Sequence, residues 1–178
     1  MNLENTKARL NFLKTILESQ STMQRVQVVA TKAMEAEHKS RIFTDGKASD
    51  GSEIGKYSKK ETHISVPVVG LPSIKPKGKT RKAKKTKYYA DGYKGFREDV
   101  GRQTAKVDLN LTGTTASQLQ TGKSQNATTY GFTQQRAVDI MQGNEKRYRK
   151  EIIKPSVAER NVAHNAAQRE IKQLLRSV

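Results

Sequence analysis

The sequence predicts an α+β protein: a long or kinked N-terminal helix packed on a small antiparallel β-sheet, followed by a C-terminal helix. Three observations predict this class. Apolar residues recur at helical spacing near both ends of the chain, short β-branched stretches lie between them, and a turn-rich segment separates the first helical region from these stretches. The 178 residues suit one domain, so we expect a single domain over residues 1–178.

The N-terminal region is predicted to be helical in two parts. A stripe of leucines predicts a first helix over about residues 4–18. Ser21, followed three residues later by Gln24, is a capping-box pattern, and it predicts a new or kinked helix that runs to about Arg41. We expect His38 to lie on the surface of this second helix.

The centre of the chain is predicted to contain the sheet. Residues 44–58 are rich in Asp, Gly, Ser and Lys, which is typical of a loop. The stretches 61–69, 106–111 and 126–134 are β-branched or partly alternating. Together with a short strand considered next, they predict three or four strands in one antiparallel sheet.

A short strand, a turn and a short helix are predicted after the basic part of the chain. The strand covers residues 88–90, and Asp91 and Gly92 form the turn. The short helix spans about residues 93–100, and Gly101 ends it.

The last part of the chain is predicted to be helical from about Gly143. Ser156 and Glu159 form a second capping-box pattern, which predicts a helix start there. Small residues such as Ala163 and Ala167 then allow this helix to pack closely on a neighbour, in its own subunit or in the next one.

The formal net charge of +17 is concentrated in one segment. Residues 71–106 hold twelve basic and three acidic residues, which gives +9. We expect residues 71–87 to form an extended basic loop that contacts a polyanion or an acidic protein surface, with a merely solvated loop as the alternative. The candidate contact residues are Lys75, Lys77, Lys79, Arg81, Lys82, Lys84, Lys85 and Lys87.

The sequence contains no convincing catalytic or metal-binding pattern. Gly78 to Thr80 resembles the end of a Walker A motif, but Ser73 stands where that motif needs glycine. The chain has no cysteine, and its three histidines lack zinc-site spacing. We therefore expect no enzyme activity and no cofactor.

The N-terminus lacks an apolar signal core, and the longest apolar stretch is far shorter than a bilayer span. We therefore expect a protein made in the cytoplasm, with no membrane partner.

Four short motifs resemble a known family. In chain order they are Arg41-Ile42-Phe43, then Asp50-Gly51 with Tyr57-Ser58, then Gly92-Tyr93 with Phe96-Arg97, and finally Leu111-Thr112-Gly113. This order, between two helical regions, resembles the bacteriophage neck proteins of the tail-completion or virion-morphogenesis family. The resemblance covers roughly residues 33–175.

The resemblance implies a structural subunit of the virion neck. Family members form a closed ring, so we expect sixfold or twelvefold symmetry, contacts with portal, adaptor or tail proteins, and a channel through which packaged DNA passes. The basic segment would then line the channel or reach an acidic neighbouring ring. Residues assigned to packing within the subunit are Phe43, Asp50, Gly51, Tyr57, Gly92, Tyr93, Phe96, Arg97, Leu111 and Gly113.

The main alternative is a cytoplasmic nucleic-acid-binding protein that acts through residues 75–87. It predicts tight, strongly salt-dependent binding of free DNA or RNA.

Overall fold

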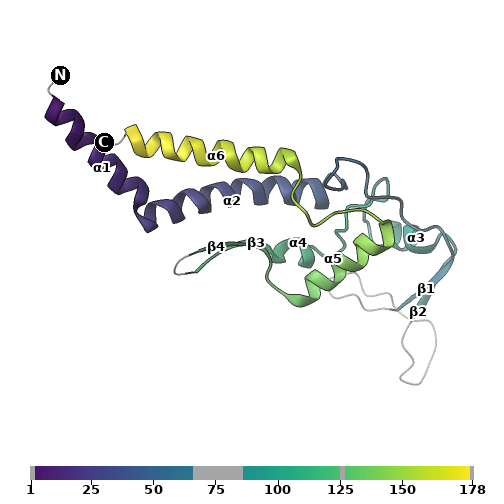
Figure 1. The fold of residues 1–178 in the computed structure, drawn as a ribbon. Helices are drawn as coiled ribbons and strands as arrows, with labels where there is room; N and C mark the ends of the chain where they lie inside the picture. The colour runs from purple at the N-terminus through teal and green to yellow at the C-terminus, as the bar shows by residue number, and fades with distance from the viewer. Residues whose placement is uncertain (1–2, 66–85, 125–126, 177–178) are drawn as a thin grey trace.

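The computed structural model describes residues 3–65, 86–124 and 127–176, and it confirms the predicted α+β class (Figure 1). In chain order the elements are α1 (Leu3–Glu18), α2 (Gln20–Phe43), β1 (Thr62–Ser65), β2 (Thr86–Tyr89), α3 (Gly92–Asp99), α4 (Thr114–Gln118), β3 (Leu119–Lys123), β4 (Thr128–Phe132), α5 (Gln135–Tyr148) and α6 (Val157–Arg176).

The N-terminal helix is kinked, as predicted, but the break lies at Ser19, where the backbone is extended. The prediction that Ser21 is the N-cap is wrong. Its hydroxyl instead hydrogen-bonds the Ser19 hydroxyl at 2.8 Å. Helix α1 then projects away from the rest of the molecule at an angle to α2 (Figure 1).

Helices α2 and α6 form the longest packed unit, and α6 runs back along α2 (Figure 1). An ion pair lies near each end of the interface. Arg41 Nε contacts Glu159 Oε1 at 2.6 Å, and Arg25 Nε contacts Glu170 Oε1 at 2.6 Å. Half-buried alanines of α6 lie between the two pairs, so the helices approach closely within this chain.

The capping box predicted at the start of α6 is confirmed. The backbone N–H of Ser156 donates to Glu159 Oε2 at 2.6 Å, and the backbone N–H of Glu159 donates to the Ser156 hydroxyl at 3.2 Å. Two N–H groups that the first helical turn cannot satisfy internally are therefore bonded.

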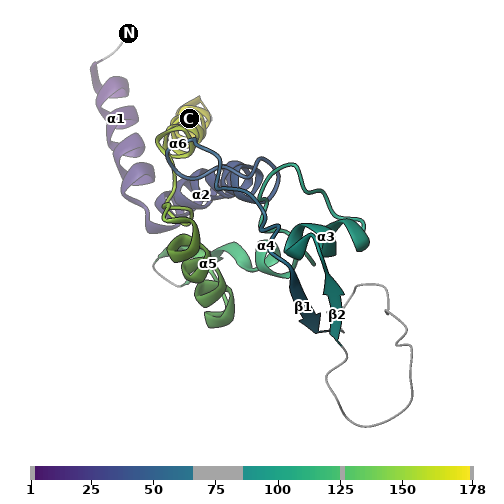
Figure 2. The same cartoon turned by 90° about the vertical axis from the view of Figure 1, so that its right-hand side faces the viewer.

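The prediction of a single sheet is wrong, because the described strands form two separate two-stranded antiparallel sheets. In one sheet β1 pairs with β2, and in the other β3 pairs with β4. The β3–β4 pair packs against α2, where the Thr121 backbone N–H donates to Glu35 Oε2 at 2.8 Å. The β1–β2 pair projects from the other part of the molecule beside α3 (Figure 2).

Two further expectations are wrong. Residues 106–111 contain no strand, and Leu109 has a φ of +50°, which no strand can accommodate. Helix α5 begins well before Gly143, which lies inside it. Helix α4 and strand β3 were not predicted. By contrast, the short helix predicted over about residues 93–100, with its end at Gly101, is confirmed as α3.

The hydrophobic core lies at the C-terminal end of α2. Its buried members come from α2, the loop after it, and segments far along the chain: Ile42, Phe43, Ala48, Ile54, Tyr57, Val107, Leu119, Met141 and Ile152. The loop over residues 44–58 is therefore fixed by its own apolar side chains. It forms part of the platform that holds α3 and the β1–β2 hairpin.

Candidate functional site at the base of the hairpin

The β1–β2 hairpin brings together the parts of the chain that precede and follow residues 66–85, which contain most of the basic loop predicted over residues 71–87. Ser65 pairs with Thr86, so the chain leaves and re-enters the described structure at neighbouring positions. Seven of the eight predicted contact residues, from Lys75 to Lys85, lie outside the described residues. The eighth, Lys87, belongs to β2, so the predicted loop over 71–87 is too long at its C-terminal end.

Lys87 already makes contacts within its own chain. Its Nζ lies 2.9 Å from Asp99 Oδ2 and 5.1 Å from the centre of the Tyr89 ring. The Tyr89 hydroxyl donates to the same carboxylate oxygen at 2.8 Å. These bonds lower the pKa of Asp99, whereas burial and the nearby carboxylate raise the pKa of Tyr89 to about 12. Lys87 therefore joins β2 to α3.

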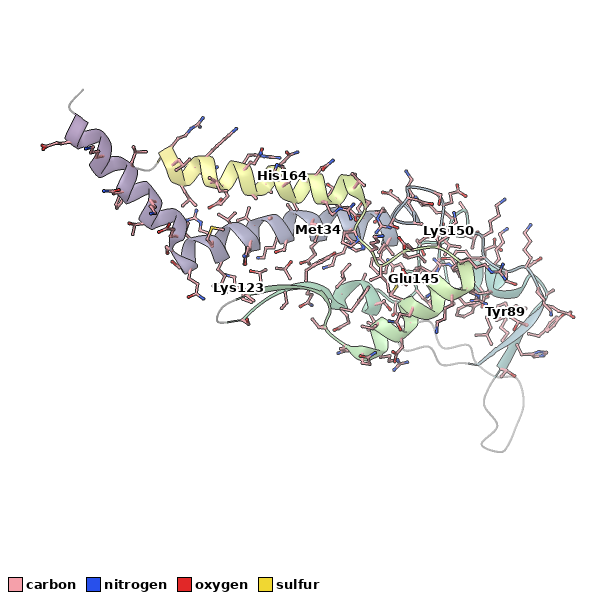
Figure 3. The ribbon with its side chains drawn as sticks, viewed as in Figure 1. Met34, Tyr89, Lys123, Glu145, Lys150 and His164 are labelled. Atoms are coloured by element: carbon pink, nitrogen blue, oxygen red, sulfur yellow. The ribbon has the colours of Figure 1, made fainter. Side chains whose placement is uncertain are left out.

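A chain of four aromatic rings connects the loop after α2 to the hairpin. Tyr57 lies 5.7 Å from Tyr93, Tyr93 lies 5.5 Å from Phe96, and Phe96 lies 5.6 Å from Tyr89, measured between ring centres. The tilted and edge-on geometries are those that aromatic pairs favour. Tyr89, labelled in Figure 3, is the end of this chain on β2.

Arg97 and Asp108 are paired in a buried network beside these rings. The Arg97 guanidinium lies 4.4 Å from the Tyr57 ring centre, and its Nη2 donates to Asp108 Oδ1 at 2.9 Å. The Tyr57 hydroxyl and the Gln103 side-chain amide also donate to the Asp108 carboxylate, at 2.9 and 2.5 Å. The backbone N–H of Asn110 adds a further bond at 3.0 Å. Burial raises the pKa of Tyr57. We refer to Tyr57, Tyr93, Phe96, Arg97 and Asp108 as the Arg97 hub.

The Arg97 hub holds several segments of the chain together. Both carboxylate oxygens of Asp108 already accept hydrogen bonds from the protein. The hub therefore fixes α3, and with it the hairpin, to the core.

Gly92 allows α3 to press against the segment before β1. Its φ is +58°, and a Cβ at this position would lie 2.2 Å from the Lys60 carbonyl oxygen. Two residues further on, the Lys94 backbone N–H donates to the Ser58 carbonyl at 3.1 Å. Only glycine fits this close approach without movement of the backbone.

The remaining motif residues lie around the same platform. Phe43 is buried in the core. Asp50 accepts a hydrogen bond from the backbone N–H two residues later, which closes the turn that contains Gly51 at a φ of +82°. Leu111 is half-buried, and Gly113 precedes α4 with a φ of +82°.

A second buried network was not foreseen. Arg41 donates to Glu159 and to the backbone carbonyls of Lys47 and Ile152, so it joins α2, the following loop and the entrance of α6. The prediction that His38 lies on the surface is wrong, because it is 1% exposed. The sequence feature that could have indicated its burial is its position four residues before the buried Ile42, which places both residues on the same face of α2.

His38 is buried beside Tyr130 of β4. Its Nδ1 lies 2.6 Å from the Tyr130 hydroxyl, and burial lowers the pKa of the imidazole. An open, mainly apolar pocket of about 340 Å³ lies beside it, between Leu119, Val138 and Pro155. His38 and Tyr130, which contact each other, are among the residues that line this pocket.

Within the described ranges, no group of three His, Cys, Asp or Glu side chains is placed to hold a metal ion. No helix among the same residues is long and apolar enough to cross a membrane.

Comparison of the chain with protein-family models, curated proteins and solved structures finds no match. Any functional proposal therefore depends on the chain's own motifs, geometry and charge.

Proposed function

We propose that this chain is a structural virion protein that forms a ring in a bacteriophage neck, joins the portal or head to the tail, and lets DNA pass. One observation carries the proposal. Two of the four family-like motifs are in mutual contact in the Arg97 hub: the second contributes Tyr57, and the third contributes Tyr93, Phe96 and Arg97. The resemblance was based on the order of the motifs in the sequence. In the structure, residues of two of these motifs also pack together and join α3 to the core.

The shape of the subunit supports assembly with copies of itself. Helix α1 and the β1–β2 hairpin both extend beyond the core, as elements that reach adjacent subunits must (Figure 1). On α1, Leu10 and Phe12 are 60% and 54% exposed. Large exposed apolar side chains on a projecting helix favour binding of another protein surface that buries them. If that surface belongs to the next copy of the chain and the head-to-tail contacts close, the copies form a ring.

The charge of residues 75–85 supports contact with a polyanion or with an acidic protein surface. Seven Lys or Arg residues between positions 75 and 85 are attached to a hairpin that the Arg97 hub fixes in place. In the proposed neck ring they line the DNA channel or contact an acidic portal, adaptor or tail protein.

Gold labelling of this protein on intact virions, viewed by electron microscopy, tests the proposal. We expect label at the head-to-tail junction. Label on the capsid, the tail tip or only on host material would contradict it.

The high local charge also favours a second candidate, a nucleic-acid-binding protein that acts through residues 75–87. Replacing the seven lysines and arginines of residues 75–85 by glutamine separates the two. The second candidate predicts loss of DNA and RNA affinity with normal virion assembly, whereas the neck proposal predicts defective assembly.

A further inference from the structure

The two acidic residues of α6 both face inward, and both are paired. Glu159 is buried against Arg41, and Glu170 is buried against Arg25, each at 2.6 Å. Exposed helices commonly mix acidic and basic residues, because pairs four residues apart stabilise the helix. On α6, by contrast, the acidic side chains lie on the buried side and the basic side chains lie on the exposed side.

The exposed side of α6 carries only basic and neutral polar residues over most of its length. After the first turn the exposed residues are Arg160, Asn161, His164, Asn165, Gln168, Arg169, Lys172, Gln173 and Arg176. Side chains that end in nitrogen project from α6 on the side away from α2, and His164 is labelled there (Figure 3). Within the described residues, no acidic side chain forms an ion pair with Arg169, Lys172 or Arg176.

The dimensions of this face suit an extended polyanion. The 20 residues of α6 span about 30 Å at a rise of about 1.5 Å each. Duplex DNA carries about one negative charge per 1.7 Å of its axis, so a helix of this length lies beside many phosphates. Asn and Gln side chains between the cations add the neutral hydrogen-bond donors that commonly accompany Arg and Lys at phosphates.

We propose that the exposed face of α6 binds the phosphate backbone of duplex DNA. The described apolar residues in the second half of α6, such as Ile171 and Leu174, are half-buried, so the exposed face lacks the apolar side chains that a membrane surface requires. This proposed surface consists of α6 residues and does not include residues 75–87. The inference does not require a ring, and it can hold even if the neck assignment fails.

Fluorescence anisotropy of the full chain with a 30-base-pair DNA duplex, over a range of salt concentrations, tests the inference. In the variant R169Q/K172Q/R176Q we expect the slope of log K against log salt to become shallower by about 2.7, at about 0.9 per lost phosphate contact. Affinity at 0.1 M salt should fall at least tenfold.

The matched control is R136Q/K146Q/R147Q, which removes three exposed cations from α5. It should keep the parent slope within about one unit. The charge-preserving variant R169K/R176K should also retain binding, which separates charge from damage to the helix. An unchanged slope in the α6 variant would overturn the inference, and so would an equal loss in the α5 control.

Discussion

The carboxylate of Asp108 organises the Arg97 hub. It receives hydrogen bonds from Arg97, Tyr57, Gln103 and the Asn110 backbone, while Arg97 itself is only 1% exposed. The Arg97 guanidinium can be buried because Asp108 balances its charge and its N–H groups donate hydrogen bonds to Asp108 and to backbone carbonyls. The stability of the platform under the hairpin therefore depends on this one acid.

Replacing Asp108 by Asn tests that dependence. The variant keeps the shape of the side chain but leaves a buried positive charge without its counter-ion, so we expect a loss of about 3 kcal/mol in the free energy of unfolding. Urea titration measures it. D139N, at an exposed position on α5, should change the same quantity by less than about 0.5 kcal/mol. Similar losses in both variants would contradict the role of the hub.

The buried His38 predicts a pH-dependent stability. Its folded-state pKa lies below the ordinary value of 6.5, so at lower pH the unfolded state binds more protons than the folded state. Its contribution is complete above about pH 6.5 and is lost as the pH falls below that value. The carboxyl groups of Glu35 and Asp99, whose pKa values are also lowered, contribute in a more acidic range.

Unfolding measured by denaturant at pH 7.5 and at pH 5.5 checks this prediction. The parent should lose stability between the two values, and H38Q, which cannot titrate, should lose distinctly less. Equal losses would show that His38 does not control this range.

Individual buried polar residues were the hardest feature to predict from the sequence. His38 and Asp108 resemble surface residues by type, and only their partners, Tyr130 and Arg97, make their burial possible. Those partners lie on other elements, so the pattern around each residue does not reveal them. Tyr93 and Phe96 were easier, because they belong to a recognisable motif.

Among the elements, α3 is positioned by a glycine that no other residue replaces easily. Gly92 and Gly101 both have a left-handed backbone, with φ of +58° and +68°, but only Gly92 is crowded. We expect G101A to cost about 1 kcal/mol from the backbone alone. G92A should cost about 3 kcal/mol, because its Cβ also meets the Lys60 carbonyl. Thermal unfolding of the two variants tests the difference, and equal costs would contradict the close approach.

Helix α1 is expected to serve assembly and not the folding of the subunit. Its Leu10 and Phe12 side chains are more than half exposed, so L10S/F12S should leave the unfolding free energy within about 0.5 kcal/mol of the parent. The same variant should fail to form rings, as seen by negative-stain electron microscopy. Normal rings would exclude these side chains from the subunit contact.

The helices were easier to predict than the sheets for a physical reason. Helices α2 and α6 follow from local periodicity, and the Ser156–Glu159 capping box marks a start that the structure confirms. Strand pairing depends on partners distant in sequence, so the same local pattern fits one sheet or two hairpins. Residues 106–111 had a strand-like composition but serve instead to deliver Asp108 to the hub.

On the scale of the whole molecule, the chain combines a packed platform with projecting parts. The Arg97 hub and the Arg41 network fix the loop after α2, α3 and the entrance of α6 at one end of the α2–α6 pair. The hairpin and α1 extend from this body (Figure 1, Figure 2). Positive charge lies both in residues 75–87 and on the outer face of α6. This arrangement suits a subunit that contacts neighbours at its extensions and a polyanion along its length.

A cryo-electron microscopy reconstruction of the head-to-tail junction tests the proposed neck role most directly. We expect density for the α2–α6 pair and the adjoining platform, repeated around the channel axis, with α1 contacting the next subunit. A junction whose density is fully explained by other proteins, with no such repeated unit, would contradict it.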